Sequence, residues 1–158
     1  MIVLSDNGFY RADNLPAGEC TVVISHPWPM SQVVEVADGR EVVANFSYEQ
    51  GSATIKGLLI RPEKKEKHSF DAVMLYKPGT CGLKAEAPYI RPNFSDGVYS
   101  RLYTDEEGKI HRIGHLPAKS FDVVAVLVND GKVVRIDMER IKLNDGVTTH
   151  VTLDLSDE

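Results

Sequence analysis

The amino-acid sequence predicts an all-β protein: an antiparallel β-sandwich in which one full unit is preceded by a partial unit of the same type. Three observations predict this class. Short apolar runs alternate with polar residues and are bounded by Gly, Pro, Asn and Asp, which is typical of strands and turns. Almost no segment sustains the 3.6-residue apolar period of a helix. The stretch NLPAGECTVVIS (14–25) also returns later in the chain as HLPAKSFDVVAV (115–126).

The repeat covers more than this one stretch. Each copy opens with Ser-Asp or Thr-Asp, has a Gly soon after, and reaches a Val-rich run through Leu-Pro-Ala. Later in each copy an Asp-Gly pair predicts a hairpin turn, because Gly accepts a positive φ and Asp hydrogen-bonds its own backbone. The matched blocks are residues 5–25 with 104–126 and residues 34–48 with 141–155; within them Asp38-Gly39 aligns with Asp145-Gly146, and Phe46 and Tyr48 align with Leu153 and Leu155.

The elements of the second half follow in order along the chain. In both copies the Pro of Leu-Pro-Ala presets φ for a turn, and Leu15 or Leu116 is expected to plug the edge of the core. The charged stretch RPEKKEKH (61–68) is expected to be a solvated loop. The predicted strands are ATIKGLLI (53–60), FDAVMLY (70–76) and GVYSRLY (97–103), followed by the hairpin VVAVLVNDGKVVRIDM (123–138).

The repeat predicts two domains of unequal completeness. Residues 1–49 correspond to the later strands only of a β-sandwich unit, whereas residues 51–156 form a complete one. A sheet without its opening strands has unpaired edges. We therefore expect the first unit to be completed by upstream chain, by a partner strand, or by residues 1–4 and the neighbouring unit. The chain is expected to be the C-terminal piece of a longer protein.

The segments TDEEGKIHRIGHLPAKSFDVVAV and SDNGFYRADNLPAGECTVVIS resemble the T-D-x-x-G-x-F-x-F-x-x-L-P-P-G-x-Y-x-L signature of carboxypeptidase regulatory-like domains. The resemblance implies an Ig-like, prealbumin-like (transthyretin-like) β-sandwich, related in plan to Cna protein B-type domains. The Gly of the signature is present as Gly18 but is Lys119 in the second copy, and its Tyr is Cys20 in one copy and Phe121 in the other. The apolar replacements at the Tyr position are compatible with the fold.

Charge and hydropathy bound the classes of partner. The first 50 residues carry two basic and seven acidic residues, and the rest carries 16 of each, so the whole net charge of −5 resides in the first part. No basic stripe can neutralise phosphates, so we expect no nucleic acid partner. No apolar run reaches membrane-spanning length, so we expect no membrane insertion. An extracellular or cell-surface location as part of a longer chain is favoured, and a cytoplasmic one stays open.

The sequence predicts no enzyme, no cofactor and no metal. The five histidines, residues 26, 68, 111, 115 and 150, lack paired ligand spacing and are interpreted as separate surface residues. The iron ligands of intradiol dioxygenases and the terminal tail of hydroxyisourate hydrolases, two enzyme classes with prealbumin-like folds, are missing. A Cna-type crosslink between Lys56 and Asp154 is disfavoured, because Leu153 and Leu155 should face inward and turn Asp154 outward, and no acidic residue is expected at a core position after the Pro turn. Cys20 and Cys81 could be free or paired.

Two loops hold the candidate contact residues. In SHPWPMSQ (25–32), Trp28 and Met30 could form a contact patch, although Trp28 is expected rather to cap the open edge of a sandwich. The connection 77–97 is longer than a sandwich needs, and both binding and decoration stay open for it. Its candidate contacts are Tyr89, Arg91 and Phe94.

These observations predict a non-catalytic β-sandwich module of a larger, cell-surface or secreted bacterial protein. Its role would be that of a spacer or of a protein-binding or adhesion unit, and its partners would be another protein or neighbouring repeats of the same polypeptide. The first alternative is a carbohydrate-binding accessory module that uses Trp28 and the loop aromatic residues. The second alternative is an accessory domain of an enzyme.

Overall fold

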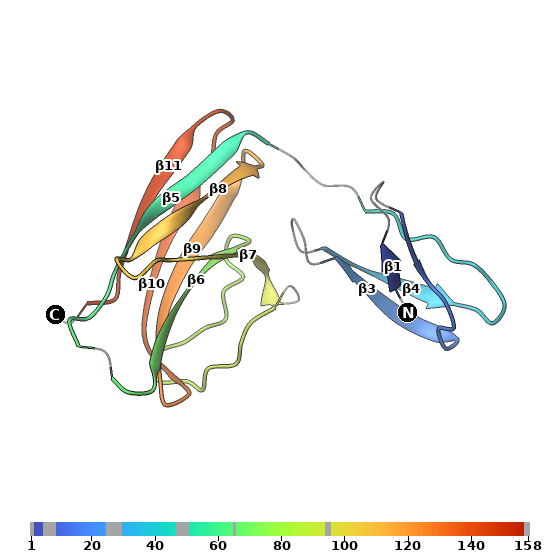
Figure 1. The fold of residues 1–158 in the computed structure, drawn as a ribbon, viewed down its shortest axis with the longest axis horizontal. Coiled ribbons are helices and arrows are strands. Elements are labelled where there is room, and N and C mark those ends of the chain that lie inside the picture. The colour runs from blue at the N-terminus through green and yellow to red at the C-terminus, as the bar shows by residue number, and fades with distance from the viewer. Residues whose placement is uncertain are drawn as a thin grey trace. The chain divides into compact units, whose positions relative to one another are not determined.

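The computed structural model describes residues 2–4, 9–24, 30–46, 51–64, 66–93 and 96–156. All regular elements in these ranges are strands, as the sequence predicts, and no helix among them is long and apolar enough to cross a membrane. The chain forms two compact units, Met1–Ser47 and Tyr48–Glu158 (Figure 1). The strands are β1 (Ile2–Leu4), β2 (Tyr10–Ala12), β3 (Gly18–Ile24) and β4 (Met30–Val36) in the first unit, and β5 (Ala53–Ile60), β6 (Ser69–Tyr76), β7 (Val98–Leu102), β8 (Lys109–Leu116), β9 (Ser120–Asn129), β10 (Lys132–Lys142) and β11 (Thr148–Asp154) in the second.

The first unit consists of two small antiparallel sheets, β1 with β2 and β3 with β4. Its described residues bury little. Ala44 is the one buried apolar residue among them, and its carbonyl accepts a hydrogen bond from the hydroxyl of Tyr10. The rings of Tyr10 and Phe46 lie 6.3 Å apart, so the segment after β4 packs on β2. The described part of this unit is therefore a pair of hairpin-like sheets without the large core of a sandwich.

The second unit is a two-layer β-sandwich (Figure 1). One layer has the strand order β10-β9-β6-β7 and is antiparallel throughout. The other has the order β11-β5-β8, in which β5 and β8 are antiparallel but β11 and β5 are parallel. The sequence pattern predicts antiparallel sheets only, so this parallel pair is a difference. It arises because the first and last strands of the unit lie side by side and run in the same direction.

Strand β9 is buried on both faces, from Phe121 to Val128. Successive side chains of a strand point to opposite faces. Phe121 lies on the face of β9 that is turned toward the other sheet. Val124, Val126 and Val128 point the other way and form a second apolar cluster with Met74 and Tyr76 of β6. The continuous apolar run of this strand therefore reflects burial on two sides, and the second covering layer is part of the candidate site described below.

The hairpins β3–β4 and β9–β10 have equivalent register. Cys20 pairs with Val34 in the first unit, and Phe121 pairs with Ile141 in the second. These four residues occupy matching positions of the aligned sequence blocks. The pairs of β3 with β4 from Glu19 with Glu35 to Ile24 with Met30 all have their counterparts at the same offsets in β9–β10. The sequence alignment and the backbone pairing therefore agree residue by residue over this hairpin, except at its first pair, whose β10-side counterpart is Leu143, just after β10.

The turns around the hairpins agree as well. Gly39 and Gly146 have φ of 67° and 71°, and in each turn the N–H of the residue after Gly donates to the carbonyl of the residue before Asp. The Leu-Pro-Ala turns differ in one respect. Leu116 is completely buried, as expected, but Leu15 is 45% exposed. The expectation for Leu15 was wrong, because the described part of the first unit has no second layer against which it can pack.

Candidate functional site

The long connection between β6 and β7 lies across the outer face of the four-stranded sheet. Its residues Cys81, Leu83 and Tyr89 pack on the second apolar cluster, whose members include Val126 and Val133. The ring of Tyr89 also meets that of Phe70 edge-on, with ring centres 5.4 Å apart. An apolar cover of this kind gives a two-layer sandwich a third layer and accounts for the length of the connection.

Backbone hydrogen bonds fix this connection to the start of β10. The N–H of Glu86 donates to the carbonyl of Val133 (2.8 Å), and the N–H of Val133 donates to the carbonyl of Ala87 (2.9 Å). The N–H of Tyr89 donates to the carbonyl of Gly131 (2.7 Å). The connection therefore behaves locally as an additional strand at the sheet edge, where a free row of donors and acceptors would otherwise face solvent.

A buried carboxylate anchors the other end of the connection. Asp122 on β9 is fully buried and receives the N–H of Gly79 at 2.7 Å. It also accepts two hydrogen bonds from the guanidinium of Arg140, at 2.6 and 3.0 Å. The hydrogen bond from Arg140 and that from the Gly79 N–H hold the pKa of Asp122 below its usual value, against the opposing effect of burial. The expectation that no acidic residue follows the Pro turn at a core position was therefore wrong.

One hydroxyl in the covered cluster has no hydrogen-bond partner among the described residues. Tyr76 is fully buried on β6, and its side-chain oxygen is unsatisfied. Burial, followed by the neighbouring Cys81, raises the pKa of Tyr76, so that its phenol is neutral throughout the physiological range. Tyr76 therefore contributes packing rather than acid-base chemistry.

The structure separates the predicted contact residues. Tyr89 is half-buried in the covering layer, whereas Arg91 is exposed two residues later. Met30 begins β4 and pairs with Ile24, but its side chain lies outside the described part of the structure. Trp28 and Phe94 lie outside the described residues. No common surface of these five residues is therefore described, and Tyr89 serves mainly to cover the sheet.

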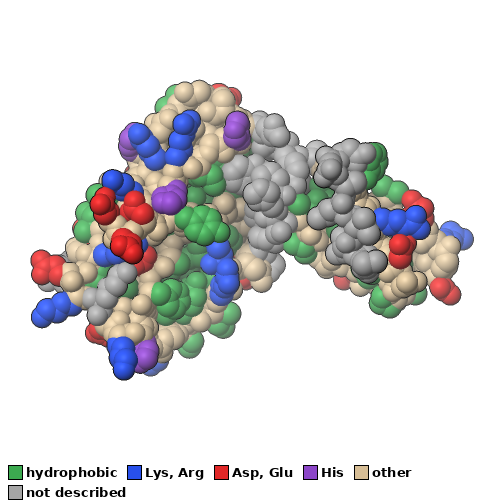
Figure 2. All heavy atoms as spheres, in the orientation of Figure 1, with side chains coloured by type: hydrophobic (Ala, Val, Ile, Leu, Met, Phe, Trp, Pro, Cys, Tyr) green, Lys and Arg blue, Asp and Glu red, His purple; other side chains and the backbone are tan. Residues whose placement is uncertain are grey.

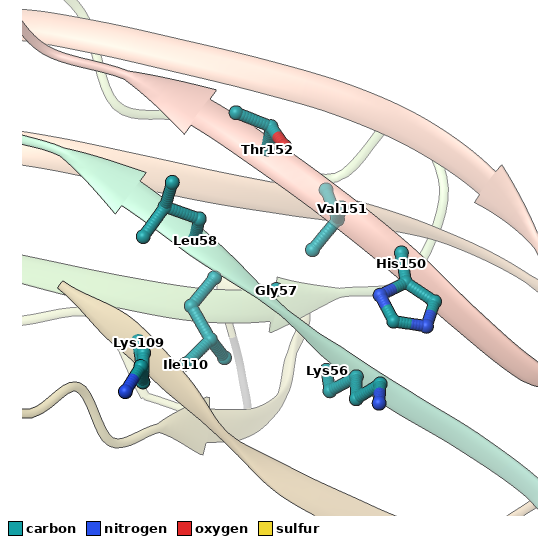
Figure 3. A pocket seen from close by; sticks show the side chains of 8 residues that line it. All are labelled: Lys56, Gly57, Leu58, Lys109, Ile110, His150, Val151 and Thr152. Atoms are coloured by element: carbon teal, nitrogen blue, oxygen red, sulfur yellow. The ribbon is translucent and has the colours of Figure 1, made fainter.

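A hollow lies on the outer face of the three-stranded sheet, over Gly57 (Figure 3). It is shallow, with a volume of about 300 Å³, and Lys56 and His150 stand at its rim as register neighbours on β5 and β11. Figure 2 shows Lys, Arg and His side chains over this layer, with Asp and Glu side chains beside them. Lys109 lies on the opposite rim and pairs with Glu107 at 3.0 Å. This open, basic rim can attract an anionic group, but the residues that line it include no buried polar group aimed at a ligand.

A second ion pair, which is largely buried, joins the two layers just after the end of β5. Arg61 follows β5 and donates two hydrogen bonds to Asp71 on β6, at 2.8 and 3.1 Å. Its remaining donors reach the hydroxyl of Thr104 and the carbonyls of Asp105 and Glu106 in the turn between β7 and β8. The hydrogen bond to Asp71 raises the pKa of the Arg61 guanidinium. The stretch 61–68 is thus not simply the solvated loop that its composition predicts, because its first residue is a clamp with 15% of its side chain exposed.

In the described structure, the residues considered for metal binding, for a disulfide and for a crosslink lie apart from one another. No three His, Cys, Asp or Glu side chains come together as a metal site in the part of the chain that the structure describes. Cys20 and Cys81 are both free thiols. Lys56 pairs in register with His150, four positions away from Asp154, and both side chains are exposed. The outward orientation expected for Asp154 is confirmed, and its carboxylate accepts the N–H of Ser156 at 2.8 Å.

Sequence reasoning missed the ion pairs Asp122–Arg140 and Asp71–Arg61. Asp122 stands within an otherwise apolar run, and a charged residue in such a run is a signal that it has a buried partner. Its partner Arg140 is remote in sequence and carries no signal of its own. Gly57 was also overlooked, although an isolated Gly within a strand pattern indicates a close approach of another backbone. A Cβ at this position would lie 2.1 Å from the carbonyl oxygen of Val151.

No match was found in comparisons of the chain with models of protein families, with curated proteins or with solved structures.

Proposed function

We propose that this chain is a non-catalytic spacer module of a larger cell-surface or secreted protein, and that its second unit resists mechanical tension. The observation that carries the proposal is the parallel pairing of β5 with β11. These strands are the first and last of the second unit, so that tension applied through the chain enters the unit at Ala53 and leaves it at Asp154. The way in which these two strands separate therefore decides how the unit responds to pulling.

Parallel terminal strands resist such tension in shear. Thr54 lies beside Thr148 at one end of the ladder, and Ile60 lies beside Asp154 at the other. Tension between the start of β5 and the end of β11 therefore acts along the strands and loads all of the evenly spaced hydrogen bonds together. An antiparallel pair of terminal strands would instead be pulled from the same end and would open one bond at a time.

Two further contacts support this role. Leu155 N–H donates to the carbonyl of Ile60 at 2.8 Å and extends the ladder past the last strand residue. Arg61 ties the chain after β5 to β6 and to the turn before β8. Both lie at the end of the ladder where the load leaves the unit. We also propose that both units are of one carboxypeptidase regulatory-like type arranged in tandem, and the equivalent register of their hairpins supports this.

Single-molecule pulling of the full chain tests the proposal. With handles at both termini, extension of residues 53–154 releases about 350 Å of chain at roughly 3.4 Å per residue, which distinguishes the second unit from the shorter first one. The control keeps the amino-terminal handle but moves the other to an azide-bearing residue in place of Thr148, at the same end of the ladder as Ala53. Force then peels β11 from β5.

The expected result is a markedly higher unfolding force in the first geometry than in the second, because forced unfolding depends on the barrier along the pulling direction. The native fold is the same in both experiments, so a difference cannot come from stability. Equal forces in the two geometries would refute the proposed resistance to tension.

A further inference from the structure

The outer edge of β3 differs from that of its counterpart in the second unit. Within the described residues, β3 pairs only with β4. Its counterpart β9 pairs with β10 on one side and with β6 on the other. The hairpins otherwise match in register, so the second unit displays which kind of strand fits the edge that β3 presents.

The exposure of one apolar residue on β3 also differs from that of its counterpart on β9. Val23 of β3 is 52% exposed, and its counterpart Val124 is fully buried. Val124 pairs in register with Met74 of β6, and both belong to the covered cluster. Val124 is buried jointly by Met74 beside it and by the connection that covers this cluster, whereas Val23 has an exposed apolar side chain, to which a strand of the β6 type would bring an apolar neighbour.

The charge of the β3–β4 hairpin also favours a strand of the β6 type. When the register of β6 on β9 is transferred to β3, Tyr76 falls opposite Thr21, and Lys77 falls next to the acidic end of the hairpin. That end carries Glu19 and Glu35, which are paired in register and exposed. The first 50 residues hold the whole net charge of −5. An incoming strand with a basic residue after its last apolar position would offset this charge.

We propose that β3 is an acceptor edge that binds an extended strand of a different protein in antiparallel orientation. The bound strand would alternate apolar residues as β6 does and carry a basic residue at its carboxyl end. Main-chain hydrogen bonds along Gly18–Ile24 supply affinity, and the contact with Val23 supplies selectivity for the strand register. This binding site goes beyond the spacer role, which concerns the second unit only, so that failure of one proposal leaves the other standing.

A synthetic peptide of residues 67–78, KHSFDAVMLYKP, serves as the probe. It contains the strand that occupies the equivalent edge within the second unit. The protein is the full chain labelled with ¹⁵N, and the readout is the change of backbone amide shifts on titration. The expected result is a saturable change centred on residues 18–24. The same peptide with Met74→Pro is expected not to bind, because proline removes a ladder hydrogen bond, and this control leaves the protein unaltered.

Two matched protein variants test the edge itself. Val23→Glu is expected to weaken peptide binding about tenfold or more, since about 1.4 kcal/mol corresponds to a factor of ten and burying a Val side chain contributes a similar amount. Val33→Glu is the control. Val33 is 57% exposed on the same face of the hairpin but lies on β4, and its counterpart Arg140 is exposed as well. Binding by this variant is expected to equal that of the wild type.

Three outcomes would overturn the inference. The first is the absence of a saturable shift at peptide concentrations up to about 1 mM, which corresponds to only about 4 kcal/mol of binding free energy. The second is a set of shifts located outside β3. The third is a concentration-dependent dimer of the free protein that Val23→Glu abolishes, because a second copy of the chain would then be the occupant of the edge.

Discussion

Asn14 and His115 adopt the same left-handed backbone conformation, with φ of 60° in each, and each directly precedes Leu-Pro-Ala. The turn thus requires a positive φ in both units, and each copy meets the requirement with a residue that tolerates it. We expect His115→Asn to change the free energy of unfolding by less than about 0.5 kcal/mol. His115→Val should destabilise the protein by about 1–2 kcal/mol, because a β-branched side chain clashes in this conformation.

Urea denaturation of the purified full chain provides the measurement, and His111→Val is the control. His111 is exposed on the same strand and does not have a positive φ. If His111→Val and His115→Val cost the same free energy, the left-handed conformation is not the cause of the loss.

Gly57 is required by the parallel ladder between β5 and β11. A Cβ at Gly57 would meet the carbonyl oxygen of Val151 at 2.1 Å, and neither backbone can withdraw without breaking the ladder. Gly57→Ala should therefore lower the free energy of unfolding by about 1–3 kcal/mol or more. Gly82→Ala is the matched control, since nothing lies within 4 Å of a Cβ there and its φ is not positive. Equal thermal unfolding temperatures of the two variants would contradict the conclusion that the ladder requires a glycine at position 57.

The pH dependence of stability tests the anchor at Asp122. Its folded-state pKa is lowered, mainly by the hydrogen bond from Arg140, so the pair stabilises the protein above the unfolded-state pKa of about 3.9 and loses this effect as pH falls through the folded-state value. Asp122→Asn should cost about 1–2 kcal/mol near neutral pH, a modest value because Arg140 is 59% exposed. The difference from the wild type should shrink steadily below about pH 4.

Chemical denaturation between pH 7 and pH 3 measures this difference directly. Glu139→Gln, an exposed change on β10 next to Arg140, is the control and should have little effect at any pH. A cost of Asp122→Asn that stays constant down to pH 3 would show that the charge of Asp122 is not what stabilises the connection.

Arg61 cannot be replaced by lysine without loss, because its planar guanidinium serves Asp71 through two parallel hydrogen bonds while also reaching Thr104 and Asp105. We expect Arg61→Lys to lower the free energy of unfolding by about 1–3 kcal/mol. Arg112→Lys, at an exposed position of β8, should be nearly neutral. In the pulling experiment Arg61→Lys should also lower the force of the shear geometry. An unfolding free energy equal to that of the wild type would remove Arg61 from the set of residues that join the two layers.

Local patterns in the sequence predict much of this fold. The strand predicted at 53–60 coincides with β5, and the Asp-Gly and Leu-Pro-Ala turns lie where the repeat places them. These features depend on residues close together in the sequence. The parallel partner of β5 could not be predicted in the same way, because β11 follows it only after the whole unit and neither strand encodes the direction of the other. Local alternation nevertheless correctly placed Leu153 inward and Asp154 outward.

The candidate site was less accessible to sequence reasoning for a related reason. Tyr89 in an unusually long loop suggests a contact residue, and only the tertiary fold reveals that the loop turns back over β9. The same holds for Asp122, whose burial depends on Arg140 and on the Gly79 N–H, both remote along the chain. Composition indicates that a loop or a charge is unusual, but it does not identify the surface that the residue meets.

The layer formed by Cys81, Leu83 and Tyr89 has a consequence for the handling of the protein. Beneath it lies VVAVLV (123–128), an uncharged, β-branched run of the kind that assembles into amyloid-like stacks once it becomes accessible. A protease that nicks the chain within 77–97 would remove the shield without cutting either sheet. We expect such nicked material to retain its strands at first and then to precipitate as thioflavin-positive fibrils. The integrity of this one connection therefore determines how long the protein stays in solution without aggregating.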